Sequence, residues 1–238
     1  MRTLVALGTC LKGHTLPEVR VPTAVQTVPG LSQQVERLIA LGVHEIGGLS
    51  ASELRAAVAE PEPEDADSLL VIHPDRAPAS ALASLLEYGG KRGFIVVDMP
   101  DVDDFSSIEQ VALPLGPVYL VSGLDRGDHM ANWSPDEALP SITAAGRTPL
   151  TVVEGIHWLL QQPDVLARGH CFMTIGSRLR KPNGSLDART PALWISNGTG
   201  RDGLVNRNAP KLGWCWAGNR HTWLGFASAA SRRLTATS

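Results

Sequence analysis

The sequence predicts an α+β fold, in which N-terminal helices and a small sheet pack on a mainly antiparallel C-terminal sheet. Helix-start signals dominate before residue 168, whereas short β-branched or aromatic segments separated by Gly, Asn and Pro loops dominate after it. A hydrophobic content of 43% over 238 residues allows a sizeable core. We expect an N-terminal arm at 1–30, a helix-rich α/β part at 31–167 and an antiparallel β part at 168–238. One continuous domain is the alternative for the last two parts.

The first helices are expected directly after the arm. Ser32 can cap a helix with one apolar face, and Gly42 can end it. Ser50 and Glu53 have the spacing of a capping box, in which each side chain binds the backbone N–H of the other residue. The sequence therefore predicts two helices before residue 60.

A strand, a helix and a second strand are expected next, at 69–72, 79–86 and 94–97. Continuous apolar strands are typical of a buried sheet, so we expect both strands to belong to one such sheet. The segment 118–121 predicts a further strand. The acidic residues of 98–104 fit no complete calcium loop, and we interpret them as a solvated turn.

Two more capping boxes predict two more helices. Ser134 and Glu137 begin one of them, and Thr151 and Glu154 begin the other. Glu154 thus has a structural function, with a catalytic carboxylate as the weaker alternative. His157 lies on the same helix, and we expect it to be structural and not a ligand.

The C-terminal part is expected to form the antiparallel sheet. Its segments are short, aromatic or β-branched, and the predicted strands lie at 171–175, 191–196, 212–216 and 221–226. The loops at 181–184 and 198–203 are candidates for ligand contact, because connecting loops on a rigid scaffold often bind ligands.

The segment 211–228 holds three of the six tryptophans, a cysteine and a histidine. A two-residue turn at Gly218 and Asn219 would pair its two strands as a hairpin. In that register one face carries Trp214, Trp216, His221 and Trp223, while Cys215 points to the other face. Such an aromatic wall could stack a planar ligand, or it could be part of the core, and both alternatives stay open.

The cysteines predict neither a disulfide framework nor a metal site. Cys10, Cys171 and Cys215 are odd in number and widely spaced, which favours free thiols and a cytoplasmic location. Cys171 and Cys215 with His170 and His221 lack the paired spacing of zinc ligands. We therefore expect no metal and no cofactor, and no segment is long and apolar enough for a membrane span.

Charge is distributed unevenly along the chain. Residues 168–238 contain eleven Arg and Lys residues against two Asp residues, a net charge of +9. Since the whole chain carries −3, residues 1–167 carry −12. A basic third could bind an anionic ligand, but the acidic part docking on the basic part is the simpler interpretation. We expect no nucleic-acid binding, because no recognised motif accompanies the charge.

Several C-terminal motifs are long enough to be specific. They read PALWIS at 191–196 and PKLGWCWAGN-x-HTWLG at 210–225, and they follow the run 147–155 and the pair Cys171 and Phe172. With these motifs the chain resembles, over about residues 31–232, an actinobacterial domain family of unknown function. The resemblance implies no reaction and no substrate. The longer stretches 181–189 and 197–208, and Arg220 where a proline is usual, could change ligand choice.

Our leading hypothesis is an accessory protein that binds a planar or anionic small molecule at a pocket lined by Trp, His and Arg. The expected ligand-binding residues are Arg178, Trp194, Asn197, Trp214, Trp216, Asn219, Arg220, His221 and Trp223. The first alternative is an enzyme of specialised metabolism that uses His221 as acid or base near Asp202. A nucleic-acid or protein-interaction module is the second. The sequence leaves the oligomeric state open.

Overall fold

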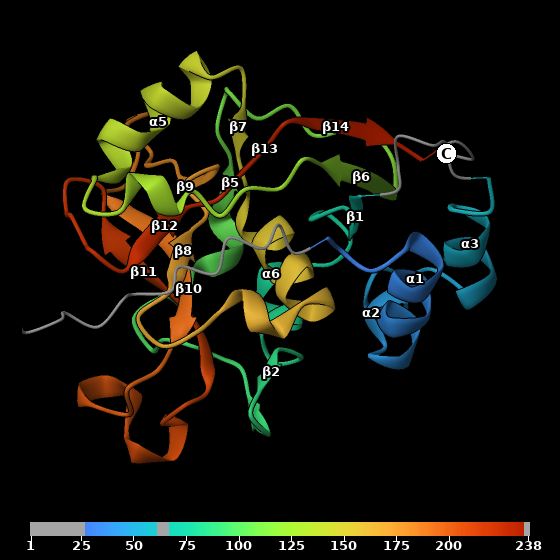
Figure 1. Ribbon diagram of the computed structural model, residues 1–238, viewed down its shortest axis with the longest axis horizontal. Helices are drawn as coiled ribbons and strands as arrows, with labels where there is room; N and C mark the ends of the chain where they lie inside the picture. The colour runs from blue at the N-terminus through green and yellow to red at the C-terminus, as the bar shows by residue number, and fades with distance from the viewer. Residues whose placement is uncertain (1–26, 61–66, 236–238) are drawn as a thin grey trace, which may run out of the picture.

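The computed structural model describes residues 27–60 and 67–235, so the predicted arm lies outside the described residues apart from 27–30. Three helices, α1 (Leu31–Ala40), α2 (Val43–Ile46) and α3 (Ala51–Ala56), lie together at one side of the molecule (Figure 1). The remaining elements form two main sheets and three two-stranded ladders around α6 (Val152–Gln161). The predicted α+β class is confirmed, and most strand pairs are antiparallel.

The first sheet has the order β1 (Ser68–Ile72), β6 (Val118–Ser122) and β14 (Ser231–Leu234), all antiparallel. Side chains occupy the outer edge of β1. The amide of Gln34 accepts from the N–H of Leu70 at 2.9 Å and donates to the carbonyl of Ser68 at 2.8 Å. His157 Nε2 accepts from the N–H of Ile72 at 3.2 Å. With that edge satisfied, β1 accepts no further strand there.

The second sheet has the order β12 (Leu224–Phe226), β8 (Cys171–Met173), β10 (Arg189–Ile195), β11 (Pro210–Trp216) and β4 (Phe94–Ile95). The β8–β10 and β10–β11 pairs are antiparallel, while β12–β8 and β11–β4 are parallel. The prediction that 69–72 and 94–97 share one sheet was wrong. Because β1 is bounded by β6 and by side chains, the second strand instead extends the C-terminal sheet.

Three short ladders complete the fold, and two of them connect the two halves of the chain. They are β2 (Glu87–Tyr88) with β3 (Lys91–Arg92), β5 (Phe105–Ser107) with β9 (Ser177–Leu179), and β7 (Thr148–Pro149) with β13 (Ser228–Ala229). Strands from before and after residue 167 thus pair within both main sheets and within two of these ladders. The division into parts at residue 167 stays a prediction.

Local signals located the helices well. The three predicted capping boxes are present at α3, at α5 (Pro135–Ala144) and at α6, and Gly42 has a φ of 72° just after α1. The Ser32 cap was wrong, because α1 already begins at Leu31. The N–H groups of Gln33 and Gln34 donate to the carbonyl of Gly30, so the helix starts before Ser32. The helix expected at 79–86 is α4 (Ala79–Ala83).

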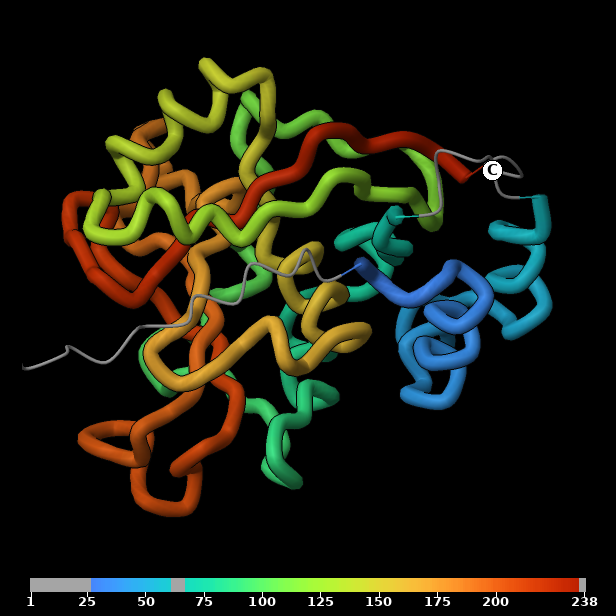
Figure 2. Tube along the Cα trace, viewed as in Figure 1, coloured from blue at the N-terminus to red at the C-terminus, as the bar shows by residue number. Residues whose placement is uncertain are grey.

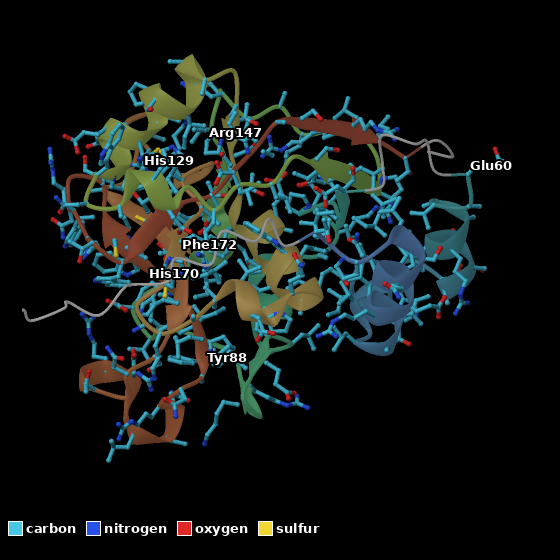
Figure 3. All side chains as sticks on the ribbon, in the orientation of Figure 1. Glu60, Tyr88, His129, Arg147, His170 and Phe172 are labelled. Carbon is cyan, nitrogen blue, oxygen red and sulfur yellow. The ribbon has the colours of Figure 1, made fainter. Side chains whose placement is uncertain are left out.

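Helix α6 is the centre of the core. All ten of its residues are buried, and it contacts both β1 and β10. Gly155 permits this packing, since a Cβ there would lie 2.6 Å from the Thr174 side chain. Phe172 of β8 is fully buried and lies near the middle of the molecule, whereas Glu60 lies at its edge (Figure 3).

A buried ion pair attaches β14 to α6. Arg232 Nε donates to Glu154 Oε1 at 2.6 Å, and the hydroxyl of Tyr119 donates to the same oxygen at 3.1 Å. The carboxylate and the guanidinium are 0% and 4% exposed. Glu154 also closes the capping box of α6, so its structural function is confirmed.

The hairpin predicted for 211–228 was wrong in its pairing. A tight turn does form, because the N–H of Asn219 donates to the carbonyl of Trp216 at 3.0 Å. However, β11 already pairs with β10 on one edge and with β4 on the other, and β12 pairs with β8. A contact with α5 holds the turn, because the N–H of Asp136 donates to the carbonyl of Ala217 at 3.2 Å. The hairpin face expected to carry Trp214, Trp216, His221 and Trp223 therefore does not form.

None of the helices in 27–60 and 67–235 combines the length and the apolar character needed to cross a bilayer.

Candidate functional site

The long loop 197–208 projects from β10 and β11 (Figure 2). A hollow of about 320 Å³ lies beside the second sheet at the base of this loop. The residues lining it come from the end of β10, from that loop, from β11 and from the segment after β4. They are Val96, Asp98, Trp194, Asn197, Thr199, Arg201, Asp202, Lys211 and Trp214. Four of these, Trp194, Asn197, Asp202 and Trp214, are among the residues predicted from the sequence.

The register of β10 and β11 places Trp194 opposite Lys211. The Lys211 ammonium lies 4.4 Å from the centre of the Trp194 ring, which is a cation–π contact. The same ring leans over Gly213, where a Cβ would lie 2.7 Å from Trp194 Cη2 and 3.0 Å from Val96 Cγ1. Gly213 is therefore required for space and not for its backbone conformation.

Asp202 fixes the ammonium of Lys211 from the other side. Its two carboxylate oxygens accept from Lys211 Nζ at 2.8 and 2.7 Å, and Ser196 Oγ donates to one of them at 2.6 Å. The N–H of Gly198 donates to Ser196 Oγ at 3.0 Å. Both charged side chains are nearly buried, at 11% and 12% exposure. This network holds the loop against β11 and orders one wall of the hollow.

A second ion pair crosses the hollow near the solvent. Arg201 donates to the carboxylate of Asp98, and the Arg201 side chain is 70% exposed. Asn197 accepts from Arg168 Nη1 at 3.0 Å. The charges around the hollow are thus paired, two cations with two carboxylates, and the outer pair is the more accessible.

The remaining predicted aromatic residues form two contact sets. Trp214 and Trp216 pack edge to face, with ring centres 4.5 Å apart. Trp223 contacts both Trp194, at 6.3 Å, and His221, at 5.2 Å. A single aromatic wall therefore does not form. Each set contributes one ring, Trp194 or Trp214, to the lining of the hollow.

His221 lies outside the residues that line the hollow. Its Nε2 atom is buried and has no hydrogen-bond partner among the described residues, and burial lowers the pKa of the imidazole. Asp202 instead contacts Lys211 and Ser196. His221 and Asp202, the pair considered for acid–base chemistry, therefore do not share a site.

The predicted anion-binding arginines are engaged elsewhere. Arg178 of β9 donates to the carbonyl of Asp187 at 2.6 Å, and desolvation lowers the pKa of its guanidinium. Arg220 donates to Glu137 at the start of α5, and Asn219 is exposed in the neighbouring turn. None of these three residues lines the hollow.

Burial makes the two cysteines of the described residues, Cys171 and Cys215, poor nucleophiles. It raises the pKa of the Cys171 thiol and of the Cys215 thiol to about 11. Both are free thiols. Within 27–60 and 67–235, no three His, Cys, Asp or Glu residues come together as a metal site.

The comparison with known families agrees with the expected resemblance to a domain family of unknown function. Residues 37–235 match the model of the Family of unknown function (DUF5701). The chain belongs to this family. No curated protein and no solved structure matches it. Family membership therefore supplies no reaction, and chemical conclusions must come from the site itself.

The acidic and basic parts of this DUF5701 chain neutralise each other through specific ion pairs. Five basic residues of the C-terminal third pair with acidic residues that precede residue 168, in the pairs Arg180–Glu109, Arg189–Asp101, Arg201–Asp98, Arg220–Glu137 and Arg232–Glu154. The acidic segment 98–104 forms a turn in which Asp103 and Asp104 are exposed, and Asp103 also accepts from the N–H and hydroxyl of Ser80.

Sequence reasoning missed Lys211, Arg201 and Asp98. A signal for Lys211 was present, because strands at 191–196 and 210–216 joined by one loop form an antiparallel pair that brings Lys211 near Trp194. Asp98 and Arg201 are separated by 103 residues, and no local pattern links them.

Proposed function

We propose that this chain binds a small planar molecule with an anionic group in the hollow beside Trp194 and Trp214. The observation that carries the proposal is that two indole rings and two cations, Arg201 and Lys211, line one hollow. A volume near 320 Å³ is at the lower end of the range for ligand pockets, roughly 300–1,000 Å³, and favours a ligand with one ring system.

Fixed and exchangeable groups lie on different sides of this site. Lys211 is held by Asp202 and by the Trp194 ring, so its ammonium is fixed and its charge is already balanced. Among the described residues Arg201 is bound to Asp98 alone, in a pair exposed to water, and such pairs contribute about 0–1 kcal/mol. A ligand carboxylate can therefore replace Asp98 at Arg201 at little cost.

Hydrogen-bonding groups of the loop support recognition of a polar ring. Asn197 and Thr199 are exposed at the hollow and offer both donors and acceptors. Aromatic faces and a few placed polar groups are the usual composition of a small-molecule site. The acid–base alternative would need His221 at the hollow, where it does not lie.

Three further inferences accompany this proposal. The free thiols lead us to infer a cytoplasmic location. We also infer that the family is actinobacterial and that the 191–196 and 210–225 motifs are its signature. The 210–225 motif contains Lys211, Gly213 and Trp214, which supports a role of this motif in forming the hollow.

Titration of intrinsic tryptophan fluorescence with nicotinate, a planar carboxylate, tests the proposal. We expect saturable quenching that weakens at least tenfold with the neutral amide nicotinamide and with Arg201→Gln. Arg207→Gln is the matched control, because Arg207 is exposed in the same loop but does not line the hollow.

The proposal is wrong if benzoate and nicotinate both fail to give saturable binding up to 10 mM, a range chosen to include weak affinities of about 1 mM. It is also wrong if Arg201→Gln and Arg207→Gln bind nicotinate equally well.

A further inference from the structure

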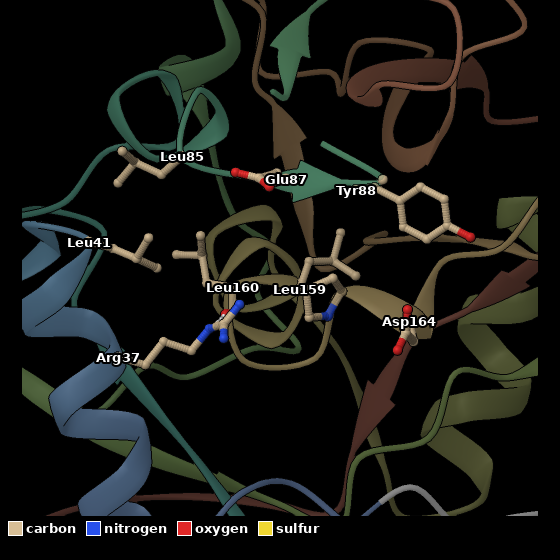
Figure 4. Close-up of a pocket in the computed structure, with 10 residues that line it drawn as sticks. Arg37, Leu41, Leu85, Glu87, Tyr88, Leu159, Leu160 and Asp164 are labelled. Carbon is tan, nitrogen blue, oxygen red and sulfur yellow. Dashed lines mark hydrogen bonds between the residues drawn. The ribbon is translucent and has the colours of Figure 1, made fainter. Parts of the chain in front are cut away.

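A groove of about 560 Å³ lies on another part of the molecule, between α1, the segment 85–89 and the end of α6 (Figure 4). Its lining residues are Arg37, Leu41, Leu85, Glu87, Tyr88, Gly89, Leu159, Leu160, Pro163 and Asp164. None of them lines the hollow described above.

Four leucines give the groove an apolar floor. Leu159 and Leu160 of α6 are 3% and 2% exposed, and Leu41 and Leu85 are partly buried and pack against the core. Only Leu41 and Leu85 keep part of their apolar surface open to the solvent, and covering this part removes it from water.

The charged residues of the groove have no ion-pair partners among the described residues. These residues are Arg37, Glu87 and Asp164, all of them exposed. Arg37 Nε donates to the carbonyl of Leu160, so the guanidinium is held in place while its two Nη nitrogens have no partner among the contacts of the described chain. In the hollow, by contrast, every cation is already paired.

Opposite charges lie at opposite ends. Arg37 is on one side of Leu159 and Leu160, and Asp164 and Tyr88 are on the other (Figure 4). Helix α6 ends at Gln161, and Gln162 leaves the helical conformation, so Asp164 lies beyond the end of the helix whose Leu160 carbonyl holds Arg37.

We propose that the groove binds a short apolar peptide through both of its termini. The peptide carboxylate pairs with Arg37, the peptide ammonium pairs with Asp164, and an apolar side chain covers the accessible surface of Leu41 and Leu85. A single ligand with both terminal charges satisfies both ends of the groove, whereas an alkylamine leaves Arg37 without an anion.

Isothermal titration calorimetry with the dipeptide Leu-Leu tests this site. We expect one saturable site on the full chain, at least tenfold weaker binding for Arg37→Gln and for Asp164→Asn, and loss of binding for N-acetyl-Leu-Leu-amide, which lacks both terminal charges. Arg55→Gln is the matched control, since Arg55 is exposed on α3, outside the groove, and pairs only with Glu36.

Three results would overturn the proposal. One is the absence of saturable Leu-Leu binding up to 10 mM by a chain whose thermal unfolding shows that it is folded. The second is equal binding of the blocked and the free dipeptide, which would indicate a purely apolar site. The third is hexylamine binding as tight as Leu-Leu binding and insensitive to Arg37→Gln, which would indicate an amine site. Nicotinate binding at the hollow is measured separately, so either proposal can fail alone.

Discussion

Acid should destabilise this protein through His157. Its Nε2 accepts from the N–H of Ile72, and its Nδ1 lies 2.9 Å from the carbonyl of Val153, so the neutral imidazole with a proton on Nδ1 satisfies both contacts. A second proton would place one donor against another. Burial in the core lowers the pKa of His157 from 6.5 to about 4, against the smaller opposing effects of Val153 and Glu154.

The sign follows from the proton balance. Between pH 6.5 and 4 the unfolded chain binds a proton at this position and the folded chain does not, so stability falls as pH falls through this window. For these two pKa values, the free energy of unfolding decreases by about 2 kcal/mol between pH 8 and pH 5. The full loss, reached below pH 4, is about 3 kcal/mol.

Urea unfolding followed by circular dichroism at pH 8, 7, 6 and 5 measures this loss. His157→Gln removes the titration while its amide can still accept from Ile72 and donate to Val153. The stability difference between the wild type and this variant should shrink by about 2 kcal/mol from pH 8 to pH 5. Burial also lowers the pKa of His221, but that contribution is common to both proteins and cancels.

His129→Gln is the control, because His129 is exposed. Parallel stability curves for the wild type and His157→Gln over this pH range would refute the reasoning.

Three further predictions concern single substitutions. Gly213→Ala should displace the Trp194 ring and weaken nicotinate binding at least tenfold, while Gly218→Ala, at a position where a Cβ meets no atom within 4 Å, should not. Arg232→Leu leaves the Glu154 carboxylate buried without its cation and should cost about 3–5 kcal/mol in urea unfolding, and a cost below 1 kcal/mol would contradict the structure. Ser134→Ala removes the cap of α5 and should cost about 1 kcal/mol in the same assay.

Elements with a local signal were predictable from the sequence. A capping box such as Ser50 with Glu53 specifies a helix start within four residues, and Gly42 ends α1 because it adopts a positive φ. Both depend on the chain near them and not on the rest of the fold.

Strand partners were not predictable in the same way. The turn at Gly218 and Asn219 forms, but whether its arms pair depends on which strand edges are free. Strand β11 pairs with β10 on one edge and with β4 on the other, and β4 precedes β11 by more than 110 residues in the sequence. A two-residue turn carries no information about such a competitor.

The candidate site was predicted in part for the same reason. Trp194, Asn197, Asp202 and Trp214 line the hollow because all belong to one loop and the two strands that it joins. Arg178, Asn219 and Arg220 were included for their charge or polarity alone, and the structure places them beside other partners. Asp98 reaches the hollow only through the parallel β4–β11 pair.

The side chains along the outer edge of β1 have a consequence for self-association. An unpaired strand edge is a template on which another chain can add a strand, and the sequence of β1, SLLVI, is apolar after Ser68. Gln34 and His157 occupy the backbone groups that an incoming strand would need. Since β1, Gln34 and His157 are all buried, an event that detaches α1 and α6 from β1 would expose this edge to intermolecular β-sheet formation.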